Sequence, residues 1–291
     1  MIVGTGPAGL ECAHALANRG YHVVMAEKKA HAGGRVLLES RLPGLSEWKR
    51  VMDYRLDALK IMANVEIYYE SEVTLENIDD FGFDNIIVAT GASWKNNGQG
   101  QNNRKILTKD NSIIVLTPDD LMAGVIPQGK VVIYDTDHYY MAGVLAELCV
   151  SQGLHVSYMS PANRVSEWTE NTLEQQKIQT RLMQNNVELI LNHKLMIAKN
   201  NSIQSQCVYT NSMHVTECDT LILVTERCPN DQLFTTLEIN NKFKSFSLIG
   251  DAYAPGIIAQ AVHSGHLQAE IFGDTGANNG HFKRDKNPLL L

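Results

Sequence analysis

The stretch Met1-Ile2-Val3-Gly4-Thr5-Gly6-Pro7-Ala8-Gly9 is followed by one predicted helix, one predicted strand and then Glu27. A G-x-G-x-x-G turn between a strand and a helix, with an acidic residue roughly 20 residues further on, is typical of a dinucleotide-binding βαβ unit. Gly4 would permit the tight turn, Gly6 would let the main chain approach a pyrophosphate, and Gly9 would let the helix pack closely on the strand.

The residues around this turn complete the expected unit. Apolar residues recur at helical spacing through 8–18, Gly20 ends that helix, and 21–26 reads as a second parallel strand. Glu27 stands at the strand tip, where a carboxylate can accept both hydroxyls of an adenosine ribose and would repel a 2′-phosphate. The helix N-terminus offers free N–H groups to phosphates. The alternative, an ordinary strand–helix turn, is disfavoured because all four features occur together.

The composition is that of a globular protein. The 291 residues suffice for one large or two medium domains, and 44% hydrophobic with 20% charged residues allow a normal core. The net charge of −7 disfavours nucleic acid and anionic lipid as partners. The sequence has no apolar run of the roughly 20 residues that cross a bilayer and no signal peptide. We therefore expect a cytoplasmic location.

The five cysteines are dispersed. They form no CxxC pair and no cluster with histidines at metal-ligand spacing, so we predict no metal site. The same spacing excludes the flavoprotein disulfide reductases, which need a redox-active cysteine pair beside the flavin. Cys12 and Cys149 fall on predicted helices, where we expect them to be small buried hydrophobic residues. This usage suits a reducing compartment.

A second strand–helix–strand unit lies in the middle of the chain. Residues 130–134 predict a strand and residues 144–151 an Ala-rich helix, and the sequence at 152–158 echoes that at 19–25. The order strand, helix, strand again predicts a parallel sheet.

The turn of this second unit differs from the first. The segment Asp135 to Gly143 contains a single glycine, and it places Asp135, Asp137 and two tyrosines where a pyrophosphate would need bare main chain. Ser160 stands about where the ribose-binding acid would be. We therefore predict a Rossmann scaffold without a working NAD(P)H site. The alternative is a distorted site that still binds weakly.

Three further segments are predicted to lie near a cofactor. The loop at 31–35 supplies Gly33, Gly34 and an arginine that could reach a phosphate or a flavin edge. The strand at 84–92 ends in small residues that would pass beneath the cofactor. A strand ending in Gly250-Asp251 beside a helix at about 256–272 is how two-domain flavoproteins hold the flavin end of FAD. A plain glycine turn and a plain Asp cap are the respective alternatives.

The expected cofactor contacts lie in these turns and strand ends: Gly4, Gly6, Pro7, Ala8, Gly9, Glu27, Lys28, Gly34, Arg35, Val73, Ala89, Thr90, Gly91, Gly250 and Asp251. We predict no catalytic base or nucleophile. His263 and His266, on the last predicted helix, are expected to be packing or surface residues.

These segments resemble a known family. The stretches 42–48, 53–55, 135–141, 168–172 and 249–255 are similar to the C-terminal half of the trimethylamine, dimethylamine and histamine dehydrogenases, and more distantly to 2,4-dienoyl-CoA reductase and related NADH:flavin oxidoreductases. The resemblance covers nearly the whole chain. One position departs from it, because Glu226 stands where the family usually has glycine.

The resemblance implies an architecture and partners. Family members carry an N-terminal TIM barrel with FMN and a [4Fe–4S] cluster, and their C-terminal half holds ADP or FAD. Nothing in this sequence could form that barrel or ligate the cluster. The first strand has only Met1 to Val3, against typical strands of about five or six residues, so we expect a fragment or split subunit. The implied partners are a TIM-barrel domain or subunit and an electron-transfer flavoprotein.

The sequence thus predicts an α/β chain with two Rossmann-like dinucleotide-binding domains of the glutathione reductase-like FAD/NAD(P) fold, the second inserted in the first. We place the FAD- or ADP-binding domain at 1–107 and 225–282, the inserted NAD(P)-binding-like domain at 108–224 and a tail at 283–291.

Three functions stay open from the sequence. The first is an FAD-binding module of a flavin-dependent oxidoreductase of the amine dehydrogenase type. The second is a non-redox ADP-binding structural or regulatory domain, which the same glycine turn and Glu27 would serve equally well. The third is a free-standing NAD(P)H-dependent flavin reductase, against which the 135–143 turn argues.

Overall fold

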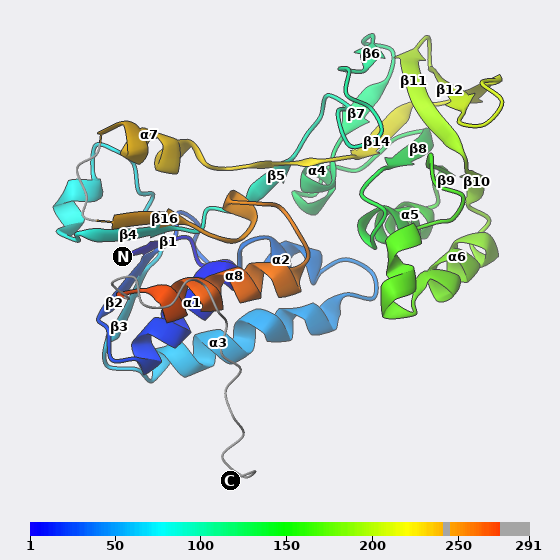
Figure 1. Cartoon of the computed structure of the whole chain (residues 1–291). Helices are drawn as coiled ribbons and strands as arrows, with labels where there is room; N and C mark the ends of the chain where they lie inside the picture. Colours follow the sequence, from blue (N-terminus) through cyan, green and yellow to red (C-terminus); the bar gives the residue numbers. More distant parts are fainter. Residues whose placement is uncertain (241–244, 274–291) are drawn as a thin grey trace. The chain divides into compact units, whose positions relative to one another are not determined.

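The computed structural model describes residues 1–240 and 245–273, so the predicted tail at 283–291 lies outside the described residues. The chain divides into two compact units (Figure 1). Of the described residues, unit 1 comprises 1–37, 48–92, 229–240 and 245–273, and unit 2 comprises 38–47 and 93–228. Each unit contains a parallel sheet with helices, so the chain has the α/β fold with two Rossmann-like units that the sequence predicts.

Unit 1 is built on a five-stranded parallel sheet in the order β16-β4-β1-β2-β3. Its strands are β1 (Ile2–Val3), β2 (Val23–Ala26), β3 (Val65–Tyr68), β4 (Asn85–Val88) and β16 (Ser245–Leu248). The short β1 is central, because Ile2 pairs with Met25 on one side and Ile87 on the other. The strand order reverses at β1, and ligands of open α/β sheets bind beyond the carboxyl ends of the strands at such a switch point.

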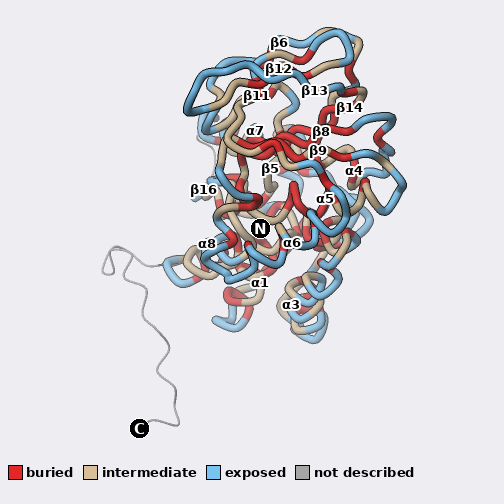
Figure 2. Tube along the Cα trace, turned by 90° about the vertical axis from the view of Figure 1, so that its right-hand side faces the viewer, coloured by how far each residue is buried: buried red, intermediate tan, exposed pale blue. Residues whose placement is uncertain are grey.

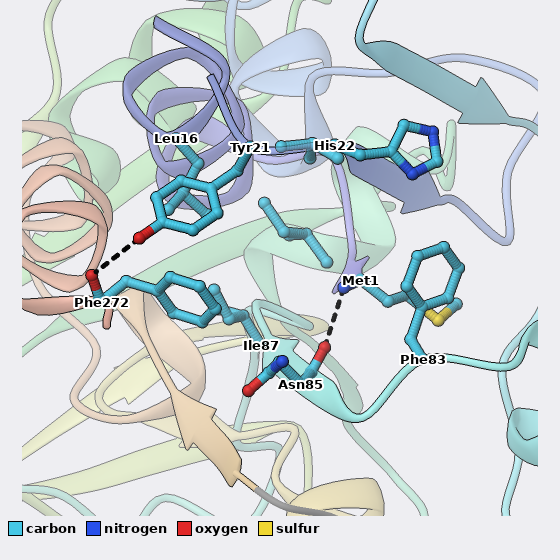
Figure 3. Close-up of a pocket in the computed structure, with 10 residues that line it drawn as sticks. Met1, Leu16, Tyr21, His22, Phe83, Asn85, Ile87 and Phe272 are labelled. Carbon is cyan, nitrogen blue, oxygen red and sulfur yellow. Dashed lines mark hydrogen bonds between the residues drawn. The ribbon is translucent and has the colours of Figure 1, made fainter. Parts of the chain in front are cut away.

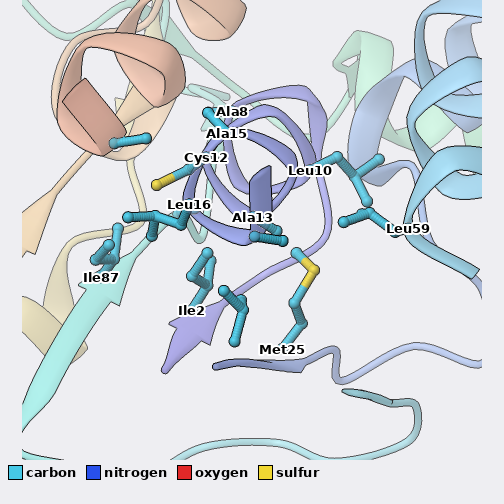
Figure 4. Close-up of a cluster of buried hydrophobic side chains, with 14 of the residues drawn as sticks. Ile2, Ala8, Leu10, Cys12, Ala13, Ala15, Leu16, Met25, Leu59 and Ile87 are labelled. Carbon is cyan, nitrogen blue, oxygen red and sulfur yellow. The ribbon is translucent and has the colours of Figure 1, made fainter. Parts of the chain in front are cut away.

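Helices cover both faces of this sheet. They are α1 (Pro7–Asn18), α2 (Gly34–Glu39), α3 (Arg50–Lys60), α7 (Gln232–Asn240) and α8 (Ile258–Ile271), with short 3-10 turns η1 (Ser46–Lys49), η2 (Ile78–Phe81) and η4 (Gly250–Ala252). Helix α1 packs between α3 and α8, and its apolar side chains face Ile2 and Met25 of the sheet (Figure 4). On the other face, Leu237 of α7 joins Val3 and Val88 in a second buried cluster.

The helices predicted at 8–18 and 256–272 and the strand predicted at 21–26 begin and end within two residues of α1, α8 and β2. The strand predicted at 84–92 instead ends at Val88, and the chain turns at Gly91, which has a φ of +76°. Helix α8 begins at Ile258 rather than 256, because the N–H groups of Gly256 and Ile257 already bond to the side chains of Asp251 and Gln260. Cys12 is buried on α1 as expected, and burial raises the pKa of its thiol to about 12.

Unit 2 holds a second five-stranded parallel sheet in the order β10-β9-β8-β14-β7 and a four-stranded sheet in the order β13-β12-β11-β6. The parallel sheet comprises β7 (Ile114–Leu116), β8 (Lys130–Asp135), β9 (His155–Met159), β10 (Glu188–Ile190) and β14 (Thr220–Val224). The other sheet comprises β6 (Thr108–Lys109), β11 (His193–Lys199), β12 (Ser202–Cys207) and β13 (Met213–Glu217). The parallel strands are mostly buried, whereas β6 and β13 consist mostly of exposed positions (Figure 2).

The helices of unit 2 are α4 (Pro118–Met122), α5 (Met141–Ser151) and α6 (Gln175–Gln184), with the 3-10 turn η3 (Glu167–Thr172). Helix α4 begins after a capping box between Thr117 and Asp120. Strands β5 (Ala92–Trp94) and β15 (Arg227–Pro229) pair where the chain leaves and re-enters unit 1.

Within the described ranges, every helix is too short or too polar to span a bilayer.

Candidate nucleotide-binding site

The glycine turn joins β1 to α1 at the carboxyl end of the central strand. Gly4 has a φ of +104°, and a Cβ there would lie 2.5 Å from the carbonyl oxygen of Ala89, so only glycine fits. At Gly6 the nearest atom to an added Cβ is the Cα of Gly34, 4.0 Å away. Gly6 therefore has free space beside its main chain. Pro7 is the first residue of α1, a position where the missing N–H costs no helix bond.

The acidic residue at the tip of β2 is tied directly to this turn. The main-chain N–H of Thr5 donates to Oε2 of Glu27 at 3.0 Å, and the Thr5 hydroxyl donates to the same oxygen at 2.7 Å. The N–H of Lys29 donates to Oε1 at 3.0 Å. Glu27 is 7% exposed, and its three charge-assisted hydrogen bonds compensate for this burial. The side chain is thereby held beside the main chain that would approach a pyrophosphate.

The loop after Glu27 returns to the same place. The N–H of Gly33 donates to the carbonyl of Thr5 at 2.9 Å. A Cβ on Gly34 would lie 3.0 Å from the Cα of Gly6, and Gly34 has a φ of +56°. The two predicted glycine segments therefore lie side by side.

The Gly-Asp turn before α8 completes this cluster. A Cβ on Gly250 would lie 2.6 Å from the Cβ of Ala8 in the first turn of α1. Asp251 Oδ2 lies 3.3 Å from Nη2 of Arg35, and its Oδ1 accepts from the N–H of Gly256 at 3.0 Å. Both oxygens of Asp251 therefore already have partners within the chain, and the two charged side chains are largely buried at 20% and 15% exposure.

The strand exit after β4 passes the turn closely. Ala89 contacts the Gly4 position, as the close approach to its carbonyl shows. Thr90 donates its hydroxyl to the carbonyl of Asn230, and the N–H of Asn230 donates to Gly91. These bonds fix the 89–91 segment against the chain that returns from unit 2.

Two of the predicted cofactor contacts, Val73 and Lys28, have side chains that do not point into this glycine cluster. Val73 is buried in the hydrophobic cluster that contains Val3 and Val88, so its side chain serves the core. The side chain of Lys28 is exposed beside the strand tip. In unit 2, Glu226 forms an ion pair with Lys95 at 2.6 Å.

The structure thus gathers the glycine turn, Glu27, Gly34, Arg35 and Gly250-Asp251 around the carboxyl end of β1. Residues 1–133 match the family described as pyridine nucleotide-disulphide oxidoreductase, and residues 116–219 match the family described as OYE-like second alpha/beta domain.

Dimethylamine dehydrogenase of Hyphomicrobium sp. (strain x) is 31% identical over 98% of this chain and 43% of its own length. The structure of histamine dehydrogenase from Rhizobium sp. 4-9 superposes with a TM-score of 0.93 at 40% identity, covering 98% of this chain and 45% of the other. The chain is homologous to the C-terminal half of these dehydrogenases.

Other solved structures agree with this homology. The 6-hydroxypseudooxynicotine amine oxidase from Pseudomonas geniculata N1 gives a TM-score of 0.90 at 34% identity, over 94% of this chain and 41% of the other. Thioredoxin reductase from Lactococcus lactis, with a TM-score of 0.60 at 16% identity, shares the fold alone. The chain spans less than half the length of the dehydrogenases that it matches.

In unit 2, the turn between β8 and α5 is occupied by the side chain of Asp135. Asp135 is fully buried, and its Oδ1 accepts from the N–H groups of Asp137 and His138 at 3.0 Å each. Its Oδ2 accepts from the hydroxyl of Tyr158. The carboxylate thus accepts hydrogen bonds from main-chain N–H groups just before α5. In a dinucleotide-binding turn, N–H groups at this place donate to a phosphate instead. Burial raises the pKa of Asp135 to about 6, against the opposing hydrogen bonds.

Further side chains close the same turn. The ring of Tyr139 packs edge-on against Trp168 at 5.3 Å, and the hydroxyl of Tyr140 donates to Glu39 at 3.0 Å. The hydroxyl of Ser160 donates to the carbonyl of Asp135 at 2.9 Å. The sequence predicted that Asp135 stands where a pyrophosphate would need bare main chain, and the structure shows that its buried carboxylate caps the N–H groups of its own loop.

A pocket of about 180 Å³ lies elsewhere in unit 1, among Met1, Tyr21, Phe83, Asn85 and Phe272 (Figure 3). These residues stand at the amino ends of β1, β2 and β4 and at the end of α8, away from the glycine turn. The pocket is therefore separate from the candidate nucleotide site.

Sequence reasoning missed one participant. Thr5 is fully buried and bonds to both Glu27 and Gly33, yet the G-x-G-x-x-G pattern treats its position as variable. A hydroxyl residue between two glycines was the only indication in the sequence. Its role becomes clear only when the structure places Glu27, at the tip of β2, beside it.

Proposed function

We propose that unit 1 binds the adenosine diphosphate part of a nucleotide, and that the chain is the nucleotide-binding part of a flavin-dependent oxidoreductase of the amine dehydrogenase type. The observation that carries this proposal is the contact between Thr5 and Glu27. It joins the main chain suited to a diphosphate to a carboxylate suited to a ribose, at the switch point of a parallel sheet.

Different residues of unit 1 would bind the diphosphate and the ribose. The N–H groups at the start of α1 and the space beside Gly6 suit the diphosphate, and Arg35 adds a positive charge nearby. Glu27 would accept a ribose hydroxyl and disfavour a 2′-phosphate. We expect the main chain at Ala89 to Gly91, Lys28 and Val73 to border the nucleotide.

ADP is the occupant that the geometry favours. An extended FAD would need a partner for its ribityl chain, and Asp251 is the predicted one. Oδ2 of Asp251 pairs with Arg35 and Oδ1 accepts from the N–H of Gly256, so a ribityl hydroxyl would compete with these partners for the carboxylate. Breaking a largely buried ion pair would oppose FAD binding.

FAD is the second candidate, favoured by the position of Gly250-Asp251 at the start of α8. Bound FAD would supply a group that accepts and passes on electrons. The free-standing NAD(P)H reductase is disfavoured, because Asp135 occupies the donors of the second turn.

The proposal extends to the whole enzyme. The homologous dehydrogenases are more than twice as long as this chain, so we propose a TIM-barrel partner, with FMN and a [4Fe–4S] cluster, that carries the substrate chemistry. An electron-transfer flavoprotein is the proposed electron acceptor, and the cytoplasm the proposed location.

Calorimetric titration of the purified chain with ADP, FAD and NADH tests this function. We expect ADP to bind at least about tenfold more tightly than FAD, a difference of roughly 1.4 kcal/mol, and NADH to bind more weakly than ADP. Equal or tighter FAD binding, with flavin absorbance retained after gel filtration, would instead establish the second candidate. Failure to bind either ADP or FAD would contradict both.

A further inference from the structure

The carboxylate of Glu27 is unequally occupied at its two oxygens. Oε2 accepts two hydrogen bonds, from the N–H and the hydroxyl of Thr5, at 3.0 and 2.7 Å. Oε1 accepts one, from the N–H of Lys29 at 3.0 Å. A carboxylate has about four acceptor positions, two on each oxygen. The donors in the described part of the chain therefore saturate Oε2 and leave one position on Oε1.

Thr5 cannot easily release Oε2. Its side chain is fully buried, and its carbonyl is held by the N–H of Gly33 at 2.9 Å. Its N–H belongs to the main chain of the glycine turn, which the close approach of Gly4 to Ala89 fixes. Both bonds to Oε2 therefore come from a residue whose own position is set by its neighbours.

We infer that Thr5 is a positioning residue that restricts Glu27 to a single ribose hydroxyl, accepted at Oε1, rather than the pair of hydroxyls that a free carboxylate would accept. This inference rests on the proposed binding of ADP by unit 1. It makes the recognition of the ribose asymmetric, so that one of the 2′- and 3′-hydroxyls contributes through Glu27 and the other does not.

The test compares three ligands by calorimetry: ADP, 2′-deoxy-ADP and 3′-deoxy-ADP. A hydrogen bond to a charged group contributes enough that its loss weakens binding by about tenfold or more. For the wild-type chain we expect one deoxy analogue to bind at least about tenfold more weakly than ADP, and the other to bind within about threefold of it.

The variants separate positioning from a general structural role. Thr5→Val removes the hydroxyl with little change of shape, and it should bring the two analogues within about threefold of each other. Thr5→Ser keeps a hydroxyl and should keep the asymmetry. Glu27→Gln should reduce the loss of affinity shown by the more weakly bound deoxy analogue, because the charged acceptor is gone. If Thr5→Val does not fold, as judged by circular dichroism, Thr5→Ala serves for the same comparison.

Three outcomes are decisive. Similar losses with both analogues in the wild-type chain would overturn the single-hydroxyl contact, whatever the variants do. A Thr5→Val protein that binds all three ligands more weakly by one common factor would show a merely structural role and overturn the positioning claim. Absence of ADP binding by the wild-type chain would instead contradict the proposed function itself.

Discussion

Gly9 lies so close to Gly4 that a Cβ on Gly9 would stand 2.1 Å from the Gly4 carbonyl oxygen. The first turn of α1 is thus packed directly on the turn that leads into it. At Gly6, by contrast, the nearest atom to an added Cβ is 4.0 Å away. The glycines of one motif therefore serve different ends, with Gly9 required by the fold and Gly6 available to a ligand.

This difference predicts unequal losses of stability for two matched substitutions. Gly9→Ala forces main-chain atoms apart and should lower the free energy of unfolding by about 2 kcal/mol or more. Gly6→Ala should change it by less than about 1 kcal/mol. Urea unfolding followed by circular dichroism measures both. Equal stability of the two variants would show that the packing of α1 on the turn is looser than described.

Glu11 on α1 is predicted to stabilise unit 1 at neutral pH. It accepts from Arg55 of α3 at 2.6 Å and pairs with His266 of α8 at 2.9 Å, which joins three helices. Burial raises the pKa of Glu11, but the hydrogen bonds from His266 and Arg55 outweigh it and hold the pKa below 4.5. The carboxylate therefore adds stability above pH 4.5 that is lost as pH falls through its lowered pKa.

Glu11→Gln should accordingly destabilise the chain by about 1–2 kcal/mol at pH 7 and by less near pH 3. Glu270→Gln is the control, because Glu270 is exposed and lies 4.0 Å from His266. We expect that control to change stability by less than about 0.5 kcal/mol. A loss that is the same for both variants would contradict the role of Glu11.

Asp135 is predicted to give the opposite pH dependence. Its pKa rises from 3.8 to about 6 on folding, so the folded chain holds the proton more tightly. This stabilisation is fully present below pH 3.8 and is lost as pH rises through about 6. A shift of this size corresponds to about 3 kcal/mol.

The measurement is the stability of the wild-type chain minus that of Asp135→Asn, which does not titrate. This difference should move in favour of the wild type as pH falls from 7.5 toward 4. A difference that stays constant across this range would show that Asp135 is not buried as described.

Arg35 is predicted to control the choice between ADP and FAD. Arg35→Gln removes a charge near the diphosphate, and it should weaken ADP binding by about fivefold or more. The same change releases Oδ2 of Asp251, so the ratio of FAD to ADP affinity should rise. Arg35→Lys keeps the charge but loses the planar fork, and an intermediate effect is expected. Unchanged ADP affinity in Arg35→Gln would remove Arg35 from the site.

The sequence sufficed for the parts of the fold that local patterns encode. The helix after Gly6, the strand before Glu27 and the second unit around 130–158 each follow from periodicity and turn residues over a short stretch. The contact of Arg35 with Asp251 spans 216 positions, and their proximity depends on β16 lying beside β4. The sequence predicted both as cofactor contacts but gave no sign that they bind each other.

The sequence does not determine the direction in which a side chain points. Asp135 ends a buried strand, and its sequence position allows both an outward charge and an inward cap. The hydroxyl that turns it inward belongs to Tyr158 on β9, and two N–H groups of its own loop complete the cap. Likewise, Thr5 and Glu27 are separated by a helix and a strand, so their hydrogen bonds become visible only when β1 and β2 pair.

Calorimetric titration of ADP into the wild-type chain and into Gly6→Val tests the central claim most directly. A branched side chain at Gly6 would fill the space beside the main chain that the diphosphate needs. We predict that the wild type binds ADP and that Gly6→Val, still folded by circular dichroism, binds it at least about 100-fold more weakly. Undiminished ADP affinity in a folded Gly6→Val protein would contradict the account.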